Sequence, residues 1–477
     1  MEKIALQSVM KQFENNKYNA SEVQKLLADE IEKSDKKIIV LDDDPTGVQT
    51  VHDIYVFTDW SVESIRRGFH APEKLFYLLT NSRGLTESQT AEVHTEISHN
   101  IMQVSNETGQ EFMIISRGDS TLRGHFPLET LVLKNLIEEG TKRKIDGEIL
   151  FPFFKEGGRF TVADIHYVNQ DGMLVPAGDT EFAKDRTFGY TKSNLCEYIE
   201  EKTKGQYLAK SVTSISLDSL RNVELDFIAS QLVGVKNFDK VVVNALDYQD
   251  VEVFCIALYR AIAQGKNFMF RTAASFVKVV GGVSNQPLLT RADMIGEDNG
   301  NGGMIVVGSH TVKTTEQLEE LRKLDNISFI EFNSDLVLND KLDKEVDRVV
   351  GISQSLILEG KTVVVYTNRK LLVLEDDTPE KALIRSVKIS EAVQALVGKL
   401  TVQPSFVIAK GGITSSDVGV KALQVKQALV LGQVKPGIPV WKTDDQSKFS
   451  GIPYIIFPGN VGETDTLREV VKILQTR

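Results

Sequence analysis

Short apolar runs alternate with amphipathic stretches along most of the chain. The apolar runs expected to be strands span residues 37–42, 75–81, 111–117, 147–154, 240–245, 303–309, 327–333, 361–368, 405–412 and 453–460. Several of the stretches between them repeat apolar residues every three or four positions, which is typical of helices that cover a sheet. Because strands that are apolar throughout are buried on both faces, the pattern predicts three-layer α/β domains with mostly parallel sheets.

The alternation is interrupted between residues 284 and 303. This stretch ends in glycine, asparagine and acidic residues without periodicity, which indicates a linker. The first 35 residues instead show helical periodicity. A chain of 477 residues also exceeds what one ordinary core accommodates. We therefore expect an N-terminal helical extension over 1–35, one domain over 36–285, a second over 300–477, and an active-site cleft between the two domains.

Composition narrows the class of protein. With 42% hydrophobic and 25% charged residues the chain is globular, and its net charge of −11 disfavours nucleic acid or an anionic membrane as a partner. Its two cysteines, Cys196 and Cys255, are too few for a disulfide framework or a cysteine-based zinc site. No apolar run approaches the ~20 residues that span a bilayer, and the N-terminus has no apolar segment of signal type. We expect a cytoplasmic protein.

Polar residues cluster where the strands of the first domain end. In open α/β sheets ligands bind beyond the carboxyl ends of the strands, and three such ends read "DDDPTG", "TNSRG" and "SRGDSTLRGH". The planar fork of arginine matches a carboxylate, so these ends predict a site for a small polar anion. The alternatives are a polar turn at "NSRG" and an ion-pair cluster centred on Asp119. The candidate substrate-binding residues here are Asn81, Ser82, Arg83, Arg117, Asp119, Ser120 and Arg123.

Two further stretches of the first domain carry candidates. In "PFFKEGGRFTVADIHYV" the glycines predict a hinged segment that closes over substrate, with Arg159 and His166 binding it; the alternative is a structural histidine. The run Asp42 to Asp44 places three like charges at the end of an apolar strand. It is either a solvated acidic turn or a set of charges held for a ligand or a metal. Successive strand side chains point oppositely, so Asp43 and Asp44 would serve different partners.

The strand ends of the second domain are rich in glycine, serine and threonine instead. They read "VGSHTVKTT", "AKGGITSSD" and "FPGNVGETD". Glycine lets backbone N–H groups approach a phosphate, although glycine turns are also common without one. The stretch "EGKTVVVY" is not a Walker A loop, because a strand rather than a helix follows its lysine. The candidate nucleotide-binding residues are Gly308, Ser309, Gly411, Gly412, Ile413, Thr414, Gly459, Asn460, Val461 and Gly462.

Nine stretches between residues 42 and 462 together resemble the four-carbon acid sugar kinase family. They are the strand ends quoted above with "PFF…GGRFT…HYV", "FAKDRTFGYTKSNL" and "FRTAASFV". The resemblance implies an ATP-dependent kinase of carbohydrate catabolism that phosphorylates a hydroxyl of threonate, erythronate or a 3-oxo or branched relative. It also implies an N-terminal acid-binding domain, a C-terminal nucleotide-binding domain, and ATP and Mg²⁺ as cofactors. The extra Asp42, and His310 after the Gly-Ser turn, depart from the family pattern.

The resemblance suggests roles for the acidic residues. Asp44 is expected as the catalytic base toward the acceptor hydroxyl, and Asp43 as the partner of substrate hydroxyls or metal, with the two roles exchangeable. The metal-ligating residues stay open, and so does the oligomeric state, with a homo-oligomer allowed. The alternative functions are a sensor that binds a sugar acid or nucleotide without catalysis, and a metal-dependent aldolase or hydrolase. The last would leave the glycine loops unexplained.

Overall fold

The structure, a computed structural model, describes residues 3–14, 17–370, 372, 374, 379–459 and 461–475. It divides into two compact units. The first unit comprises residues 1–47 and 59–285, and the second unit comprises residues 48–58 and 286–477. The segment 48–58, which directly follows the acidic strand end, therefore clusters with the second unit, although it lies inside the range 36–285 expected for the first domain.

The first unit is built on a parallel sheet in which every neighbouring pair of strands runs in the same direction. Its central strands are buried throughout, as their continuous apolar sequences predict. In spatial order the strands are β10 (Thr213–Ile215), β11 (Asp239–Val243), β6 (Gly147–Phe151), β12 (Phe268–Thr272), β5 (Phe112–Arg117), β2 (Lys37–Asp42) and β4 (Leu75–Leu79).

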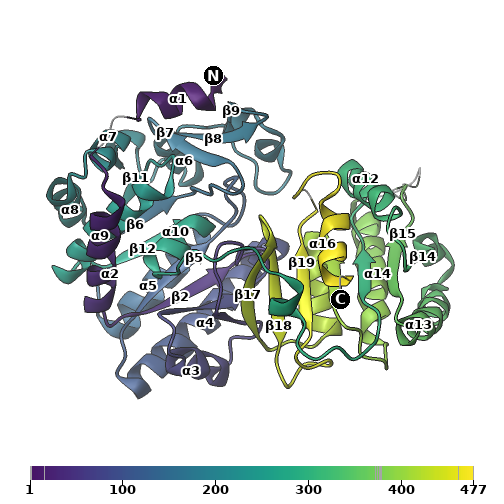
Figure 1. The fold of residues 1–477 in the computed structure, drawn as a ribbon. Helices are drawn as coiled ribbons and strands as arrows, with labels where there is room; N and C mark the ends of the chain where they lie inside the picture. Colours follow the sequence, from purple (N-terminus) through teal and green to yellow (C-terminus); the bar gives the residue numbers. More distant parts are fainter. Residues whose placement is uncertain are drawn as a thin grey trace. The chain divides into compact units, whose positions relative to one another are not determined.

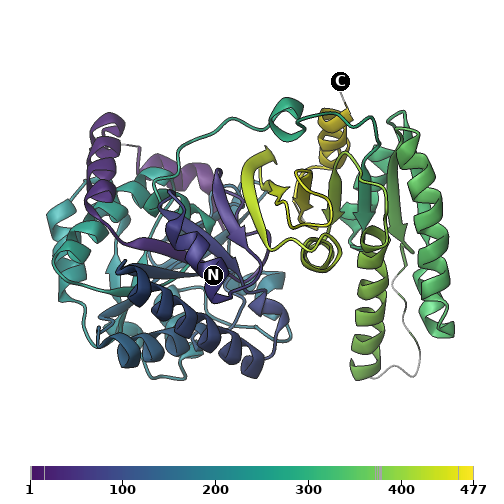
Figure 2. The same ribbon diagram turned by 90° about the horizontal axis from the view of Figure 1, so that it is seen from below.

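Helices cover both faces of this sheet, as right-handed crossovers between parallel strands require (Figures 1 and 2). The helix α4 (Glu87–Thr108) contacts α3 (Val62–His70) and α5 (Leu128–Thr141) on one face. On the other face the helix α9 (Tyr248–Ala263) contacts four helices. These are α2 (Ala20–Lys33), α7 (Leu217–Arg221), α8 (Leu225–Gly234) and α10 (Ala274–Val280).

A small antiparallel sheet completes the first unit. Its order is β1 (Ile4–Ala5), β9 (Met173–Pro176), β8 (Ile165–Gln170) and β7 (Arg159–Val162). The N-terminal stretch is helical over α1 (Leu6–Gln12) and α2, and β1 joins it to this small sheet. The helix α6 (Leu195–Lys202) follows the sheet in the chain.

The second unit carries a mixed sheet, in which five parallel strands are extended by an antiparallel meander. The parallel strands, in spatial order, are β19 (Pro453–Phe457), β16 (Val407–Lys410), β13 (Met304–Val307), β15 (Thr362–Thr367) and β14 (Ile327–Phe332). The meander adds β18 (Ile438–Thr443), β17 (Gln427–Lys435) and β3 (Ile54–Phe57).

Two groups of helices cover this second sheet. One group is α12 (Val312–Leu321) with α16 (Thr466–Gln475); the other is α13 (Leu342–Leu358), α14 (Pro379–Gly398) and α15 (Gly412–Asp417). Between residues 284 and 303, where the sequence indicates a linker, the only regular element described is the short α11 (Arg291–Met294). No helix in the described part of the chain is both long and apolar enough to cross a bilayer.

The predicted two-domain α/β fold with mostly parallel sheets is confirmed. The prediction missed β18, and it missed β17 because residues along β17 alternate between buried and partly exposed positions, whereas the predicted strands are runs that are apolar throughout. The cleft expected between the two domains stays a prediction.

Candidate functional site

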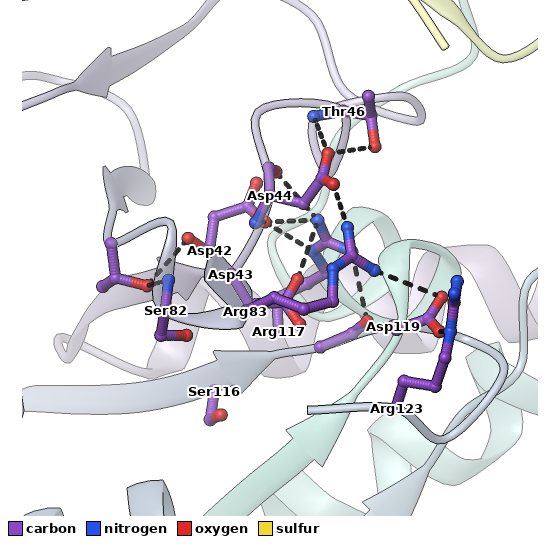
Figure 3. Close-up of polar contacts among 12 residues, drawn as sticks. Asp42, Asp43, Asp44, Thr46, Ser82, Arg83, Ser116, Arg117, Asp119 and Arg123 are labelled. Atoms are coloured by element: carbon purple, nitrogen blue, oxygen red, sulfur yellow. Dashed lines mark hydrogen bonds and ion pairs between the residues drawn. The ribbon is translucent and has the colours of Figure 1, made fainter. Parts of the chain in front are cut away.

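The polar strand ends of the first unit meet at one edge of its sheet. Asp42 ends β2 and lies opposite Leu79 of β4 and Arg117 of β5 in the strand register. Because the strands are parallel, their carboxyl ends bring "DDDPTG", "NSRG" and "RGDSTLRGH" together. Figure 3 shows these side chains converging on a common region.

Asp42 and Arg117 form a buried ion pair beneath this edge. The Nε atom of Arg117 donates to Oδ1 of Asp42 at 2.8 Å, Nη2 contacts the same oxygen, and both side chains are almost fully buried. Burial raises the pKa of Asp42 to about 7, against the opposing influence of Arg117. Nη2 of Arg117 also donates to the carbonyl of Asp44 at 3.1 Å, so the pair fixes the turn that follows β2. Arg117, predicted to bind substrate, is thus engaged within the protein.

Asp43 is a buried carboxylate with unused acceptor capacity. It is 3% exposed, and neither of its oxygens has a hydrogen-bond partner among the described residues. Among the described residues its ion-pair contact is with Arg117, whose Nη2 lies 3.7 Å from Oδ1. A buried polar group without a partner is uncommon and calls for an explanation such as a bound ligand or ion. Asp43 therefore fits the predicted role toward substrate hydroxyls or a metal.

Asp44 is held in place by two neighbours. Its Oδ1 accepts hydrogen bonds from the backbone N–H and the hydroxyl of Thr46, at 2.8 and 2.6 Å. Its Oδ2 forms an ion pair with Arg83. The side chain is 16% exposed, so a ligand can reach it. Each carboxylate oxygen offers two acceptor positions, which leaves Asp44 able to accept from a substrate hydroxyl while it keeps these contacts.

Two arginines flank Asp119. Arg83 Nη1 lies 3.6 Å from its Oδ1, and Arg123 Nε donates to its Oδ2 at 2.7 Å. Burial alone would raise the pKa of Asp119, but Arg83 and Arg123 hold it well below its usual range. Figure 3 shows Arg83 placed between Asp44 and Asp119.

Arg159 adds positive charge to the same region. Its guanidinium lies 5.7 Å from the ring centroid of Phe182, and that of Arg123 lies 5.1 Å from the same ring. Its Nε atom is buried without a hydrogen-bond partner among the described residues. Three arginines, Arg83, Arg123 and Arg159, thus lie near Asp119. Such a cluster suits a carboxylate ligand.

Other predicted residues of the first unit are engaged within the protein. Ser82 donates to Glu129 at 2.6 Å. His166 is fully buried, one ring nitrogen lies 2.7 Å from the carbonyl of Ser120, and the other lies 3.0 Å from the hydroxyl of Thr161. Burial lowers the pKa of His166 to about 4, so its ring is neutral near pH 7. These contacts shape the loops around the site. Asn81 adopts a left-handed backbone conformation just before the 3₁₀ turn Ser82–Gly84.

Sequence reasoning missed Arg271 and Glu129. They form a buried ion pair, and Arg271 also donates to the hydroxyl of Ser116 at 3.0 Å and the carbonyl of Arg123 at 3.2 Å. A Cβ atom added to Gly118 would approach the Arg271 guanidinium to 2.2 Å, so glycine is required for this approach. Arg271 thereby supports the turn that carries Asp119. The stretch "FRTAASFV" contains Arg271, but its strand, β12, was not predicted.

The glycine-rich loops of the second unit also meet at the carboxyl ends of its parallel strands. The backbone N–H of Gly308 donates to the carbonyl of Lys410 at 3.4 Å, which places "GSH" beside "KGG". The hydroxyl of Thr314 donates to the Ser309 hydroxyl at 3.1 Å and the carbonyl of Gly459 at 3.5 Å. Three of the predicted nucleotide-binding loops thus lie together.

The remaining nucleotide-site candidates can be placed individually. Gly411 and Gly462 have positive φ angles of 119° and 83°, which glycine adopts readily. A Cβ atom on Gly308 would lie 2.3 Å from the hydroxyl of Thr414. Gly412 begins α15, the side chain of Ile413 is 75% exposed, and Val461 packs partly buried against the core. Asn460 lies outside the described residues. Sequence reasoning missed Arg369, whose Nη2 donates to the carbonyl of Ser309 at 2.7 Å.

The two strand-end sites define a class: a two-domain α/β protein with charged side chains at one sheet edge and glycine loops at the other. A sugar-binding N-terminal domain profile matches residues 38–280, and a nucleotide-binding C-terminal domain profile matches residues 304–467. The chain therefore belongs to the family that combines these two domains, broadly the four-carbon acid sugar kinase family.

Solved structures share this fold at low sequence identity. A Haemophilus influenzae protein of domain family DUF1537 is 16% identical, with a TM-score of 0.59 over 92% of this chain and 100% of its own. A Salmonella typhimurium LT2 protein, provisionally called a tRNA synthase, is 14% identical, with a TM-score of 0.64 over 90% of this chain and 98% of its own. At these identities the likeness shows the fold alone. A comparison with curated proteins finds no match.

Proposed function

We propose that the protein is an ATP-dependent kinase that phosphorylates a hydroxyl of a small sugar acid, such as threonate, erythronate or a 3-oxo or branched relative. The observation that carries the proposal is the edge of the first sheet, where Asp43 has unpartnered oxygens beside a cluster of arginines. A sugar acid offers both complements, since its hydroxyls donate to carboxylates and its carboxylate accepts from arginines. The nucleotide-binding domain of the second unit is proposed to bind ATP, the other substrate.

The residues of the first unit then have separate tasks. Arg83, Arg123 and Arg159 hold the carboxylate of the acid, with Arg83 and Arg123 oriented by Asp119. Asp44 takes the proton of the acceptor hydroxyl, and the hydrogen bonds from Thr46 fix its orientation. A positioned general base contributes about 10²–10⁴-fold to such a step. Asp43 accepts from a second hydroxyl, and the roles of Asp43 and Asp44 can be exchanged.

Magnesium fits this chain as a partner of substrate phosphates. The described residues hold no cluster of three or more side chains able to ligate a metal. Proteins usually bind Mg²⁺ through one or two carboxylates together with substrate phosphates, and Asp43 has the free oxygens for this. When bound, Mg²⁺ would neutralise charge on the transferring phosphoryl group.

In the second unit, the backbone of Gly308, Gly411 and Gly459 is proposed to line the phosphates of ATP. These glycines lie in loops that contact one another, and glycine permits close approach of backbone N–H groups to an anion. Ser309 and Thr314 add hydroxyl donors beside them. The absence of a Cβ is needed at Gly308, where one would meet Thr414.

A coupled ADP-release assay with a panel of four-carbon and branched sugar acids tests the proposal. We expect Mg²⁺-dependent ADP formation with at least one acid and none with the corresponding neutral sugar, which lacks the carboxylate. Binding of acid and nucleotide without ADP formation would instead indicate a sensor. Conversion of the acid without nucleotide would indicate an aldolase or hydrolase.

A further inference from the structure

Lys410 is a buried lysine at the centre of the glycine loops. It is the last residue of β16, it precedes Gly411 directly, and its side chain is 0% exposed. Its Nζ donates one hydrogen bond, of 3.3 Å, to the carbonyl of Pro458, the residue before Gly459. It also lies 4.1 Å from the ring centroid of Phe457. An ammonium group has three donors, and the described residues provide no carboxylate as its partner.

The charged groups that face Lys410 are also positive. Lys313 of α12 and Arg369, which follows β15, are its charged neighbours, while β19 contributes Phe457 and Pro458. Burial, together with the charges of Lys313 and Arg369, lowers the pKa of Lys410 to about 7. Nη1 of Arg369 is itself buried without a partner among the described residues. Positive groups thus converge on these loops, and the described residues place no carboxylate against Lys410.

Other buried lysines of this chain are satisfied differently. Lys240 is 2% exposed, and its Nζ lies 2.7 Å from a carboxylate oxygen of Glu148. Lys37 is 4% exposed and donates to the carbonyls of Ala71 and Glu73, both at 2.6 Å. A lysine with only a structural task would be expected to have such partners. Lys410 has a single long hydrogen bond, at the position where the sequence predicts phosphates.

We propose that Lys410 is an electrostatic partner of the nucleotide phosphates and takes up a proton from solvent when the nucleotide binds. The inference rests on the proposed function of the second unit, and assigns to Lys410 a role in nucleotide affinity. A nearby polyphosphate supplies the missing negative charge and favours the ammonium form. If a group gains a proton when a ligand binds, the affinity for that ligand decreases as the pH rises above the pKa of the group in the free protein.

Calorimetric titration of the full-length protein with ADP tests the inference. At pH 8, titrations in two buffers of different ionisation enthalpy give the number of protons taken up, because the terminal phosphate is already ionised there. We expect uptake of most of one proton per ADP for the wild type, because a group that titrates near pH 7 is largely neutral at pH 8. The dissociation constant should also rise about 10-fold between pH 8 and 9.

Substitutions separate this role from a structural one. Lys410→Met retains the length of the side chain without the charge, and should weaken ADP binding about 10- to 100-fold at pH 7 and abolish proton uptake. Lys410→Arg is charged at every pH tested, so it should bind ADP without proton uptake and with a flat pH profile. Lys361→Met is the matched control, since Lys361 is a partly exposed lysine of the same unit that pairs with Glu359. It should behave as the wild type does.

The outcomes distinguish this inference from the proposed function. ADP binding by the wild type without proton uptake would overturn the inference and leave nucleotide binding intact. Unchanged proton uptake in folded Lys410→Met would also overturn it. If the folded wild type bound no ADP, the proposed function itself would fail, and the inference with it. The wild-type titration gives this answer even if Lys410→Met does not fold.

Discussion

Both sheet edges form candidate sites for an anion, but they present different chemical groups. The edge of the first unit presents charged side chains, with arginines arranged around Asp44 and Asp119. The edge of the second unit presents mostly backbone, with glycines where a Cβ atom would collide and hydroxyls between them. Charged side chains suit recognition of a small acid with a defined shape, whereas backbone N–H groups suit a phosphate chain.

The two designs have different structural requirements. Charges brought to a buried edge need partners, and the first unit provides them in the Asp42–Arg117 and Glu129–Arg271 ion pairs. Removal of one partner would leave an uncompensated buried charge. The edge of the second unit depends instead on close backbone contact, although Lys410 is a buried charge at this edge. The comparison therefore predicts that variants of the two edges fail in different ways.

The largest effect is expected at the first edge. Asp44→Asn preserves the size of the side chain but removes the basic oxygen, so turnover should fall about 10²–10⁴-fold while the acid still binds. Steady-state kinetics and calorimetric binding of the acid measure the two quantities. Asp171→Asn, in an exposed turn whose left-handed backbone asparagine tolerates, is the control. Near-normal turnover of the Asp44 variant would indicate that the three aspartates form a solvated turn without a catalytic role.

The second edge should respond to added volume. In Gly308→Ala the new Cβ would lie 2.3 Å from the Thr414 hydroxyl, so the Thr414 side chain or its loop must shift and nucleotide affinity should fall about 10- to 100-fold. Affinity for the acid should not change. Gly351→Ala in α13 is the matched control, because its added Cβ would meet nothing within 4 Å beyond its chain neighbours and the backbone of its own helix. Equal nucleotide affinity in both variants would argue against the glycine loops as the site.

The buried Glu129–Arg271 ion pair makes the stability of the first unit depend on pH. Burial raises the pKa of Glu129, but Arg271 and its other partners more than offset this and hold it at about 2, against 4.5 ordinarily. The unfolded chain takes up this proton first as pH falls, so stability present above pH 4.5 is lost toward pH 2. The loss between pH 5 and 3 should be about 2 kcal/mol.

The two tryptophans allow this loss to be assigned to one unit. Trp60 lies in the first unit and Trp441 in the second, so urea unfolding of Trp60→Phe and Trp441→Phe backgrounds follows each unit separately. Glu129→Gln should remove about 2 kcal/mol of the pH-dependent loss from the first unit's transition. Glu345→Gln should change the second unit much less, because the Glu345 partner Arg348 is half exposed. A pH dependence confined to the second unit would contradict this account.

A smaller effect is expected when the planar guanidinium group of Arg123 is replaced. Arg123→Lys retains the charge but loses the planar fork, so the Michaelis constant for the acid should rise about 10-fold while that for ATP is unchanged. Arg186→Lys, at an exposed position nearby in the chain, is the control. If both constants of the Arg123 variant rise together, Arg123 supports the fold of the protein rather than binding the acid.

Much of the fold was predictable because buried parallel strands are apolar throughout. The strands that form both site edges were predicted near their observed ends, and β2 was predicted at Lys37–Asp42 as found. The half-buried β17 was missed, since its alternating pattern gives a weaker signal than a continuous run. That residues 48–58 pair with the second unit was also not predictable, because β3 forms its ladder with β17, far along the chain.

Sequence patterns predicted which residues lie at the candidate site better than they predicted the contacts among those residues. Asp44 and Arg83 were both singled out, but their ion pair depends on where β2 and β4 end in space. His166 and Ser82 resemble ligand-binding residues in sequence, yet both make buried hydrogen bonds within the protein. Arg271 was missed because its strand, β12, was not predicted. Lys410 was missed because a charge at the end of an apolar strand is indistinguishable from an ordinary strand boundary without the tertiary structure.

Hydrogen–deuterium exchange of the full-length protein, with each ligand added alone, tests the division between the two edges most directly. A non-hydrolysable ATP analogue should slow exchange at residues 308–314 and 411–415 of the second unit. An acid that supports ADP release should slow exchange at residues 42–47 and 117–125 of the first unit. Slower exchange at 42–47 and 117–125 with the ATP analogue, while 308–314 and 411–415 are unchanged, would contradict the account.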